Sequence, residues 1–186
     1  MLAAVSVMGM SQPADSFDAH DKLLYHAGNF YSPASLAESA TFAAYLQATN
    51  SPREWGRGGS AYGERVASTI GSSAIHATLA FGLDSVLHQD PRYHPSHSTG
   101  FWRRSGHALR ATVLTHTDSG GETLSTWRIG SAYGTAFLSN QWYPDRVNTV
   151  GRAFERGSIR MGTDFARNLG AEFWPDIKRK LLRRKS

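Results

Sequence analysis

Three stretches of the chain share a composition that constrains how its helices can pack. Each is long enough for a helix, is rich in Gly, Ala, Ser and Thr, and closes on Pro and Asp beside an aromatic residue. They read GSSAIHATLAFGLDSVLHQDPRY (71–93), GSAYGTAFLSNQWYPD (130–145) and MGTDFARNLGAEFWPD (161–176). Small residues let helix backbones approach closely, which is favoured in tight bundles and inside membranes. The sequence therefore predicts how the helices pack, but no motif in it identifies a reaction.

Helix signals recur along the whole chain. Ser32-Pro33 combines a capping residue with a proline in the first turn, so it predicts a helix from 32 to about 49. Further helices are expected over 61–89, 101–116 and 122–141, then from Asp145 to about 172, and finally from Pro175. Pro144-Asp145 and Pro175-Asp176 are both interpreted as helix starts. No segment shows the alternation of a strand.

The predicted fold is all-α: a single-domain bundle of about five to six helices with Gly/Ala/Ser-rich, close-packed interfaces. A chain of 186 residues is long enough to bury one core. We assign residues 32–176 to the bundle, 1–31 to an irregular segment and 177–186 to a basic amphipathic tail. The pentapeptide GSAYG occurs at 59–63 and again at 130–134, which suggests duplicated helical hairpins.

The N-terminal sequence MLAAVSVMGMSQPADS has an apolar run followed by small residues. It is similar to the end of a secretory signal peptide that has lost its basic region. A signal remnant predicts a location in the bacterial cell envelope, on the periplasmic side; the alternative is an ordinary irregular terminus. The chain has no Cys, which excludes disulfides, thiolate metal sites and cysteine nucleophiles.

Positive charge is concentrated at the C-terminus. Six of the twenty basic residues lie in the last nine positions, which leaves fourteen against fifteen acidic residues in the body. This partition argues against a nucleic-acid surface and favours an anionic membrane. Ile177, Leu181 and Leu182 share a helical spacing among the cations, as in a helix lying at a membrane interface. The alternative is a docked helix with a frayed basic end. The candidate membrane-contacting residues are Trp174, Lys178, Arg179, Lys180, Arg183, Arg184 and Lys185.

One predicted helix is nearly long enough to span a bilayer. Val66 to Leu83 carries no formal charge over eighteen residues, close to the span of about 20 that a membrane requires. However, the run is rich in Ser, Thr and Gly, and a mean hydropathy of −0.39 is polar for a protein with several spans. Integral and peripheral association both remain open. The tryptophans at 55, 102, 127, 142 and 174 lie near helix ends, where they would form an interfacial belt or seal helix corners.

Two clusters could carry chemistry. His88, Asp90, His94 and His97 gather in the segment HQDPRYHPSH, and imidazole and carboxylate are ligands for zinc. Their spacing matches no standard zinc motif, so no metal or cofactor is expected. Asp84 and His88 are an i,i+4 pair that predicts a structural hydrogen bond. Arg152, Arg156, Arg160 and Arg167 line one helix face, which could bind phosphate or lipid headgroups or pair with carboxylates. Asp164, Asn168 and Glu172, aligned on the same helix, are expected to be buried partners of those arginines.

Four segments read together resemble a known group. FGLDSVLHQDPRYHPS, THTDSGGETLS, NQWYPDR and EFWPDIKRK are similar to an uncharacterised family of helical bacterial envelope proteins, acidobacterial ones included. The resemblance covers most of residues 50–182 and implies no activity. We therefore predict a non-enzymatic, membrane-associated envelope protein that contacts an anionic membrane surface and forms homo-oligomers through its Gly/Ala helix faces. The alternatives are a metal-dependent or phosphate-handling enzyme using the His88–His97 loop, and a soluble helical adaptor.

Overall fold

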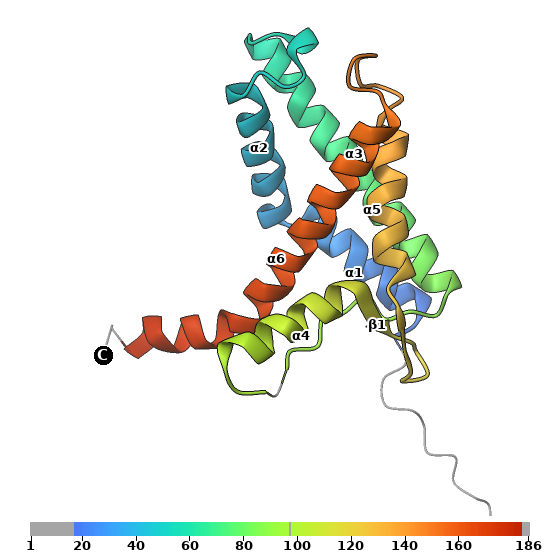
Figure 1. The fold of residues 1–186 in the computed structure, drawn as a ribbon, viewed down its shortest axis with the longest axis vertical. Coiled ribbons are helices and arrows are strands. Elements are labelled where there is room, and N and C mark those ends of the chain that lie inside the picture. Colours follow the sequence, from blue (N-terminus) through green and yellow to red (C-terminus); the bar gives the residue numbers. More distant parts are fainter. Residues whose placement is uncertain (1–16, 97, 184–186) are drawn as a thin grey trace, which may run out of the picture.

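The computed structural model describes residues 17–96 and 98–183, and most of this chain is helical (Figure 1). The predicted all-α bundle is confirmed. The helices are α1 (Ala19–Tyr31), α2 (Pro33–Ala48), α3 (Gly59–Val86), α4 (Phe101–Val113), α5 (Thr126–Ser139) and α6 (Val150–Arg183). In Figure 1, α2, α3, α5 and the first part of α6 stand upright, while α4 and the end of α6 form a foot. We call this part, Phe101–Val113 with residues 172–183, the foot.

Helix α1 corrects the prediction that residues 1–31 are irregular. Asp18 caps the helix, because its Oδ1 accepts a hydrogen bond of 2.9 Å from the backbone N–H of Asp21. The buried residues of α1 are Lys22 and His26, one turn apart, so the helix packs on the bundle through polar contacts. Its sequence therefore has no apolar stripe that would have predicted the helix. The proposed signal remnant in residues 1–16 lies outside the described residues.

The start of α2 agrees with its sequence signal. Ser32 caps the helix by accepting a 3.0 Å hydrogen bond from the N–H of Ser35, and Pro33 occupies the first turn. The loop expected after this helix is present, with a short 3-10 helix (Arg53–Trp55) in it.

Two short strands replace helix ends that the sequence suggested. Residues 114–116 and 122–124 were expected to extend helices, but β1 (Leu114–His116) and β2 (Glu122–Leu124) pair antiparallel, with Leu114 opposite Leu124. A turn over residues 117–121 joins them, and Gly120 adopts a φ of +88°. Three-residue strands are too short to show an alternating pattern, which explains the error.

Helix α6 contradicts both proline predictions, because it begins at Val150 and not at Pro144-Asp145. It runs unbroken from Val150 to Arg183 with Pro175 inside it, so Pro175-Asp176 does not start a new helix. The helix bends near this point and directs its end away from the bundle into the foot (Figure 1). A proline in a helix interior removes one backbone hydrogen bond and commonly produces such a bend. The basic tail is therefore a continuation of α6 as far as the described residues extend.

Glycines allow the close helix contacts that the sequence predicted. A Cβ at Gly130 of α5 would lie 2.8 Å from Leu83 Cδ1 of α3, and one at Gly134 would lie 3.1 Å from Leu79 Cδ1. The other GSAYG copy differs, because a Cβ at Gly59 or Gly63 would meet nothing within 4 Å. The repeated pentapeptide therefore occupies two different environments.

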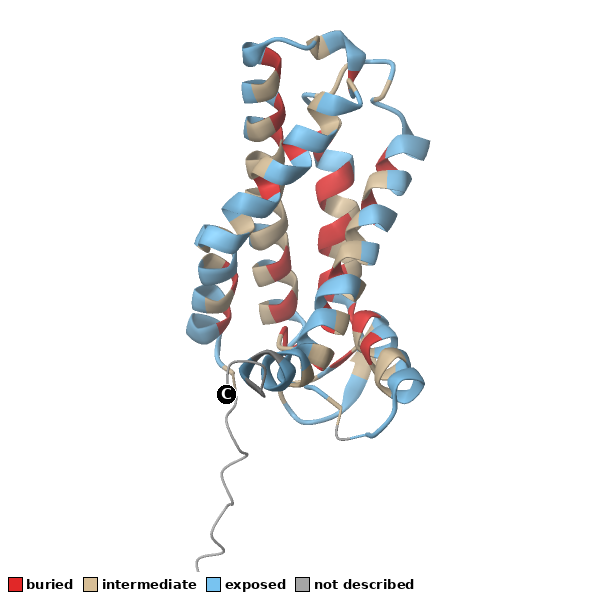
Figure 2. Cartoon of the chain, turned by 90° about the vertical axis from the view of Figure 1, so that its left-hand side faces the viewer, coloured by how far each residue is buried: buried red, intermediate tan, exposed pale blue. Residues whose placement is uncertain are grey.

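The interior is polar for a protein of this size. Among the described residues, the buried apolar side chains apart from Trp127, Pro52 and Pro91 are alanines: Ala43, Ala61, Ala80, Ala108, Ala132, Ala136 and Ala153. The largest fully buried side chains include four charged ones: Arg65, Lys22, Glu172 and Asp84. Buried positions appear in Figure 2 as narrow stripes along the helices. Charged groups are rarely buried unless they are paired, so the partners of these four matter for stability.

Each buried charge has partners from other segments. Lys22 Nζ donates to Asp118 Oδ2 at 2.7 Å and to the carbonyl of Asp84 at 3.1 Å. His26 Nε2 lies 2.5 Å from Asp84 Oδ2, so Asp84 pairs with His26 of α1. The predicted Asp84–His88 contact is wrong, because His88 follows the helix with a φ of +52° and approaches Asp118 at 3.7 Å. These contacts tie α1, α3 and the β1–β2 turn together.

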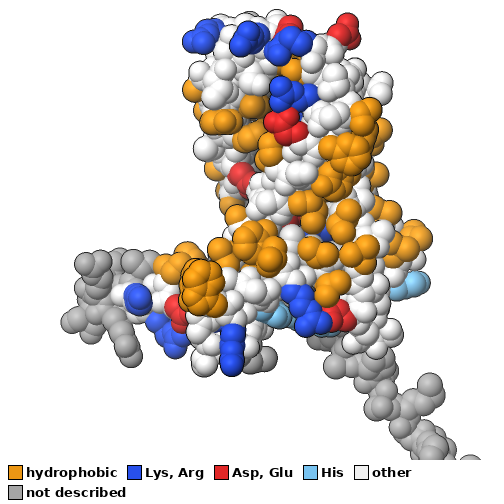
Figure 3. Space-filling view, in the orientation of Figure 1, with side chains coloured by type: hydrophobic (Ala, Val, Ile, Leu, Met, Phe, Trp, Pro, Cys, Tyr) orange, Lys and Arg blue, Asp and Glu red, His pale blue; other side chains and the backbone are white. Residues whose placement is uncertain are grey.

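Large apolar side chains are exposed in many places. They occur on the bundle and on the foot, as the orange areas of Figure 3 show for one face. The most exposed include Tyr31, Tyr45, Val86, Trp102, Val150, Leu182 and Trp174. Helix α3 is long and apolar enough to cross a membrane, with a mean hydropathy of 1.3 over its best window, yet only 11% of that window is buried. Helix α3 packs against α1, α2 and α5, yet most of its side chains remain partly exposed.

Candidate functional site

A groove of about 650 Å³ opens between α2 and α6, with α3 and α5 forming its floor. Its volume is in the range of small-molecule sites, which is roughly 300–1,000 Å³. The four arginines of the predicted stripe all line it: Arg152, Arg156, Arg160 and Arg167. The groove is the place where the fold gathers the largest share of the residues singled out by sequence.

The floor of the groove is lined by hydroxyl groups and small side chains. Thr69, Ser72 and Ser73 come from α3, while Thr135 and Ser139 come from α5. Thr69 donates to the carbonyl of Arg65 at 2.6 Å, and Ser139 donates to that of Ala136 at 2.8 Å. Thr135 Oγ1 is buried and has no partner among the described residues. Buried hydroxyls are normally hydrogen-bonded, so this one is available to a ligand.

Two arginines of the stripe are paired with carboxylates. Arg152 lies 2.5 Å from Glu155 on its own helix, and Arg167 lies 2.5 Å from Glu38 of α2. Both pairs are about half exposed, so each contributes little to stability. The sequence left open whether the stripe binds anions or pairs with carboxylates, and for these two residues pairing is what the structure shows.

The other two arginines have no carboxylate partner within ion-pair distance among the described residues. Arg156 donates to Asn140 Oδ1 and to the carbonyls of Val147 and Ala136, and its guanidinium lies 4.6 Å from the ring centre of Tyr143. Arg160 makes no hydrogen bond or ion pair with any described residue. The Nε atoms of both are buried without a partner. Two guanidinium groups in the groove thus retain unused donors.

Burial lowers the pKa of Arg156 and of Arg160 from the usual value, although an arginine stays protonated at neutral pH. Burial also raises the pKa of Asp164, against the opposing effect of Arg128, Arg160 and Arg167. Asp164 approaches Arg167 at 3.8 Å. The wall formed by α6 therefore carries more positive charge than its carboxylates balance.

The opposite wall is apolar. Phe42 and Tyr45 of α2 stack with ring centres 6.1 Å apart, and Leu46 continues the same wall. Phe42 is 42% exposed and Tyr45 is 60% exposed. From α6, Ile159 adds a further apolar side chain that is 52% exposed. The groove thus has one cationic side, a hydroxyl-lined floor and one aromatic side.

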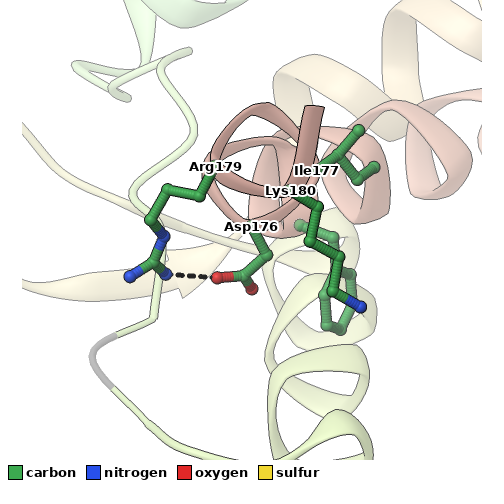
Figure 4. Close-up of a pocket in the computed structure, with 5 residues that line it drawn as sticks. Asp176, Ile177, Arg179 and Lys180 are labelled. Atoms are coloured by element: carbon green, nitrogen blue, oxygen red, sulfur yellow. Dashed lines mark hydrogen bonds and ion pairs between the residues drawn. The ribbon is translucent and has the colours of Figure 1, made fainter. Parts of the chain in front are cut away.

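The predicted membrane-contacting residues lie at the foot. Trp174, Lys178, Arg179 and Lys180 are all exposed on the last turns of α6. Figure 4 shows Asp176, Ile177, Arg179 and Lys180 around a shallow pocket there, with Arg179 paired to Asp176. The side chain of Arg183 lies outside the described part, as do Arg184, Lys185 and the side chain of Leu181.

Aromatic residues of α4 join this cationic end. Phe101 stacks on Phe173 with ring centres 5.4 Å apart, and Trp102 is 84% exposed. The five tryptophans do not share one environment, because Trp127 is buried and Trp142 donates its Nε1 to Ser68 at 2.9 Å. Trp102 and Trp174 are thus exposed, whereas Trp127 and Trp142 seal helix contacts.

The histidine-rich loop does not converge on one point. Asp90 is paired with Arg92 at 2.8 Å, and its carboxylate lies 3.8 Å from His94 Nε2. Although burial alone would raise it, hydrogen bonds from Arg92 hold the pKa of Asp90 below its usual value. His88 points instead toward Asp118 and is 81% exposed, and His97 lies outside the described residues. Among the described residues, the group close enough to share a metal ion is a different one, Asp18, His20 and Asp21, which is wholly exposed.

Asp164, Asn168 and Glu172 of α6 are buried as expected, but Glu172 and Asn168 have partners other than the arginines of the stripe. Glu172 accepts hydrogen bonds from Tyr93 at 2.6 Å, from the backbone N–H of Ser96 and from Arg104, so it fastens α4 and the preceding loop. Asn168 donates to Thr112 at 3.0 Å. Sequence reasoning missed Arg104 and Tyr93 as partners of Glu172, since they lie 68 and 79 residues away from it in the chain.

No protein-family model matches the chain, and comparison with curated proteins and with solved structures gives no match either. Function is therefore inferred from the chain's own residues.

Proposed function

We propose that this is a non-enzymatic, membrane-associated protein of the bacterial envelope, held at an anionic bilayer surface by its foot. The observation that carries the proposal is the distribution of polarity. Alanines and ion pairs occupy the interior, while residues such as Val86, Trp102 and Leu182 are exposed. Soluble monomers rarely expose large contiguous apolar patches, and such patches mark membrane or protein contacts.

The foot has the composition of an interfacial membrane contact. Trp102 and Trp174 lie with Phe101 and Ile177 among the exposed cations Lys178, Arg179 and Lys180. Tryptophan is favoured at the headgroup level, and each basic residue near an anionic surface contributes about 1 kcal/mol. The bend before Pro175 supports this role, because it separates the cationic end of α6 from the bundle (Figure 1).

Helix α3 supports membrane association but does not distinguish a spanning protein from a peripheral one. Its length and apolar character are those of a spanning helix, and little of it is buried within the chain. The resemblance to helical bacterial envelope proteins is consistent with the same location. A second copy of the chain, packed through Gly/Ala helix faces, would cover the same exposed surface and is part of the proposal.

Sedimentation with vesicles tests the contact at the foot. The full-length protein and the triple variant Lys178→Gln, Arg179→Gln, Lys180→Gln are mixed with vesicles containing 30% phosphatidylglycerol. The control variant is Arg53→Gln, Arg57→Gln, Arg146→Gln, which removes the same charge from exposed positions outside the foot. We expect the first variant to lose most of its binding and the control to keep it. Equal binding by all three proteins would contradict the role of the foot.

Cell fractionation then measures the depth of association. Release of the protein from membranes by 1 M salt is expected for a peripheral contact through the foot, since salt screens exposed charges. Retention through salt and alkaline carbonate would mean that α3 inserts. Recovery in the soluble fraction from the start would refute the proposal and favour a soluble adaptor.

A further inference from the structure

The groove between α2 and α6 contains hydrogen-bond donors without partners that an anion could accept from. Among the arginines of the stripe, Arg156 and Arg160 have no carboxylate within ion-pair distance in the described chain, and their Nε donors are buried without partners. A buried charge is costly unless an opposite charge or good hydrogen bonds compensate for it. Thr135 Oγ1, also buried and unpartnered, lines the same groove. Three buried atoms in one place therefore lack a hydrogen-bond partner among the described residues: Nε of Arg156, Nε of Arg160 and Oγ1 of Thr135. The other two nitrogens of the Arg156 guanidinium group donate to Asn140, Val147 and Ala136.

The chemistry of these donors selects phosphate or carboxylate. Guanidinium groups bind both anions through paired, charge-assisted hydrogen bonds. Hydroxyls of Ser72, Ser73 and Thr135 on the floor offer further donors to such oxygens. Five arginines and three carboxylates line the groove, so a single anion leaves it closer to neutral.

The rest of the groove fits an apolar group. Across from Arg156 and Arg160, Phe42, Tyr45 and Leu46 form an open apolar wall. Inorganic phosphate alone would leave this wall in contact with water. An anion that carries an acyl or alkyl chain covers the wall and satisfies the arginines together.

We propose that this groove binds a small anionic amphiphile, with its phosphate or carboxylate group on Arg156 and Arg160 and its apolar chain along Phe42, Tyr45 and Leu46. The site lies on the bundle and shares no residue with the foot, so it is independent of the proposed membrane contact. It holds one monomeric ligand and does not require a bilayer.

Titration calorimetry of the full-length protein tests the site with three probes: dodecyl phosphate below its micellar concentration, inorganic phosphate and neutral dodecyl maltoside. We expect dodecyl phosphate to bind with one-to-one stoichiometry, and at least tenfold more tightly than either other probe. If inorganic phosphate bound as tightly as dodecyl phosphate, the apolar wall would have no role and the amphiphile assignment would fail. If dodecyl maltoside bound equally, the anion assignment would fail.

Two variants test which residues bind the anionic group of the ligand and which bind its apolar chain. Arg160→Met removes the guanidinium group but keeps an unbranched apolar side chain, and it is expected to weaken dodecyl phosphate binding at least tenfold, whereas Arg110→Met, outside the groove, should have no effect. Tyr45→Ser should weaken dodecyl phosphate but not inorganic phosphate. Thermal melting by circular dichroism verifies that each variant is folded. Unchanged dodecyl phosphate binding by folded Arg160→Met would overturn the proposal.

Vesicle binding separates this inference from the proposed function. Arg160→Met should bind phosphatidylglycerol vesicles as the unmodified protein does, because the foot is intact. The foot triple variant should still bind dodecyl phosphate. If the foot variant lost dodecyl phosphate as well, the amphiphile would be binding at the foot and the groove assignment would be wrong.

Discussion

Buried ionic side chains carry much of the specificity of this fold at the scale of single residues. Glu172 is the clearest case, because it is fully buried and accepts hydrogen bonds from Tyr93, Ser96 and Arg104. Although burial by itself would raise it, these donors hold the pKa of Glu172 below its usual value. The ionised form is therefore the one that the fold stabilises.

Glu172→Gln is expected to destabilise the protein by about 1–3 kcal/mol, because Arg104 and the N–H of Ser96 lose a buried carboxylate acceptor while Arg104 keeps its pair with Asp176. Chemical denaturation at pH 7 measures this, with exposed Arg103→Gln as a control that should change little. The lowered pKa means that the contribution of Glu172 is present above about pH 4.3, its unfolded pKa, and is lost as the pH falls through the folded value. The variant should show less loss of stability across this acidic range. An equal loss of stability at acidic pH in the variant and the unmodified protein would contradict this role of Glu172.

Helices meet through specific close contacts at the scale of elements. Gly157 of α6 is buried against Tyr133 of α5, and a Cβ at this position would lie 2.3 Å from the tyrosine ring. Gly162, on the same helix, is exposed, and a Cβ there would meet nothing within 4 Å. An added methyl group would therefore clash at Gly157 but fit at Gly162, although the two positions are only one and a half turns apart.

Gly157→Ala should lower the free energy of unfolding by about 1–3 kcal/mol, because the added methyl group must displace Tyr133 or separate α5 from α6. Gly162→Ala should raise it by about 0.5–1 kcal/mol, since alanine is the better helix former. Urea denaturation compares the two variants. A change of the same sign in both would show that helix propensity, and not the α5–α6 contact, governs the first position.

Local signals predicted the elements whose ends are set locally. Ser32 and Pro33 start α2 as expected, because capping depends on neighbours in sequence. Pro175 was misread, since a proline in a first turn and one inside a bent helix look alike in sequence. Helix α1 was missed because its buried face is Lys22 and His26, whose partners lie 58 to 96 residues away.

The candidate site was predictable only in part. The arginine stripe follows from helical spacing, but which of its arginines pair with carboxylates depends on distant residues, as when Glu38 pairs with Arg167 across 129 residues.

The whole molecule has an upright bundle and a foot, each with its own proposed partner. The foot carries exposed tryptophan and lysine, while the groove in the bundle carries arginine and stacked aromatic rings. A protein with both contacts would hold a monomeric amphiphile beside a bilayer surface.

The alanine-lined interior has a calorimetric consequence. Unfolding raises the heat capacity through newly hydrated apolar surface and lowers it through newly hydrated polar surface. Since the buried set here is mostly alanine and charged groups, the heat-capacity increment should fall below the usual value of about 12–15 cal/mol/K per residue. Differential scanning calorimetry of the monomer measures it, and an ordinary increment would contradict the expectation. A small increment flattens the curve of stability against temperature, so this protein should resist cold far better than its modest core suggests.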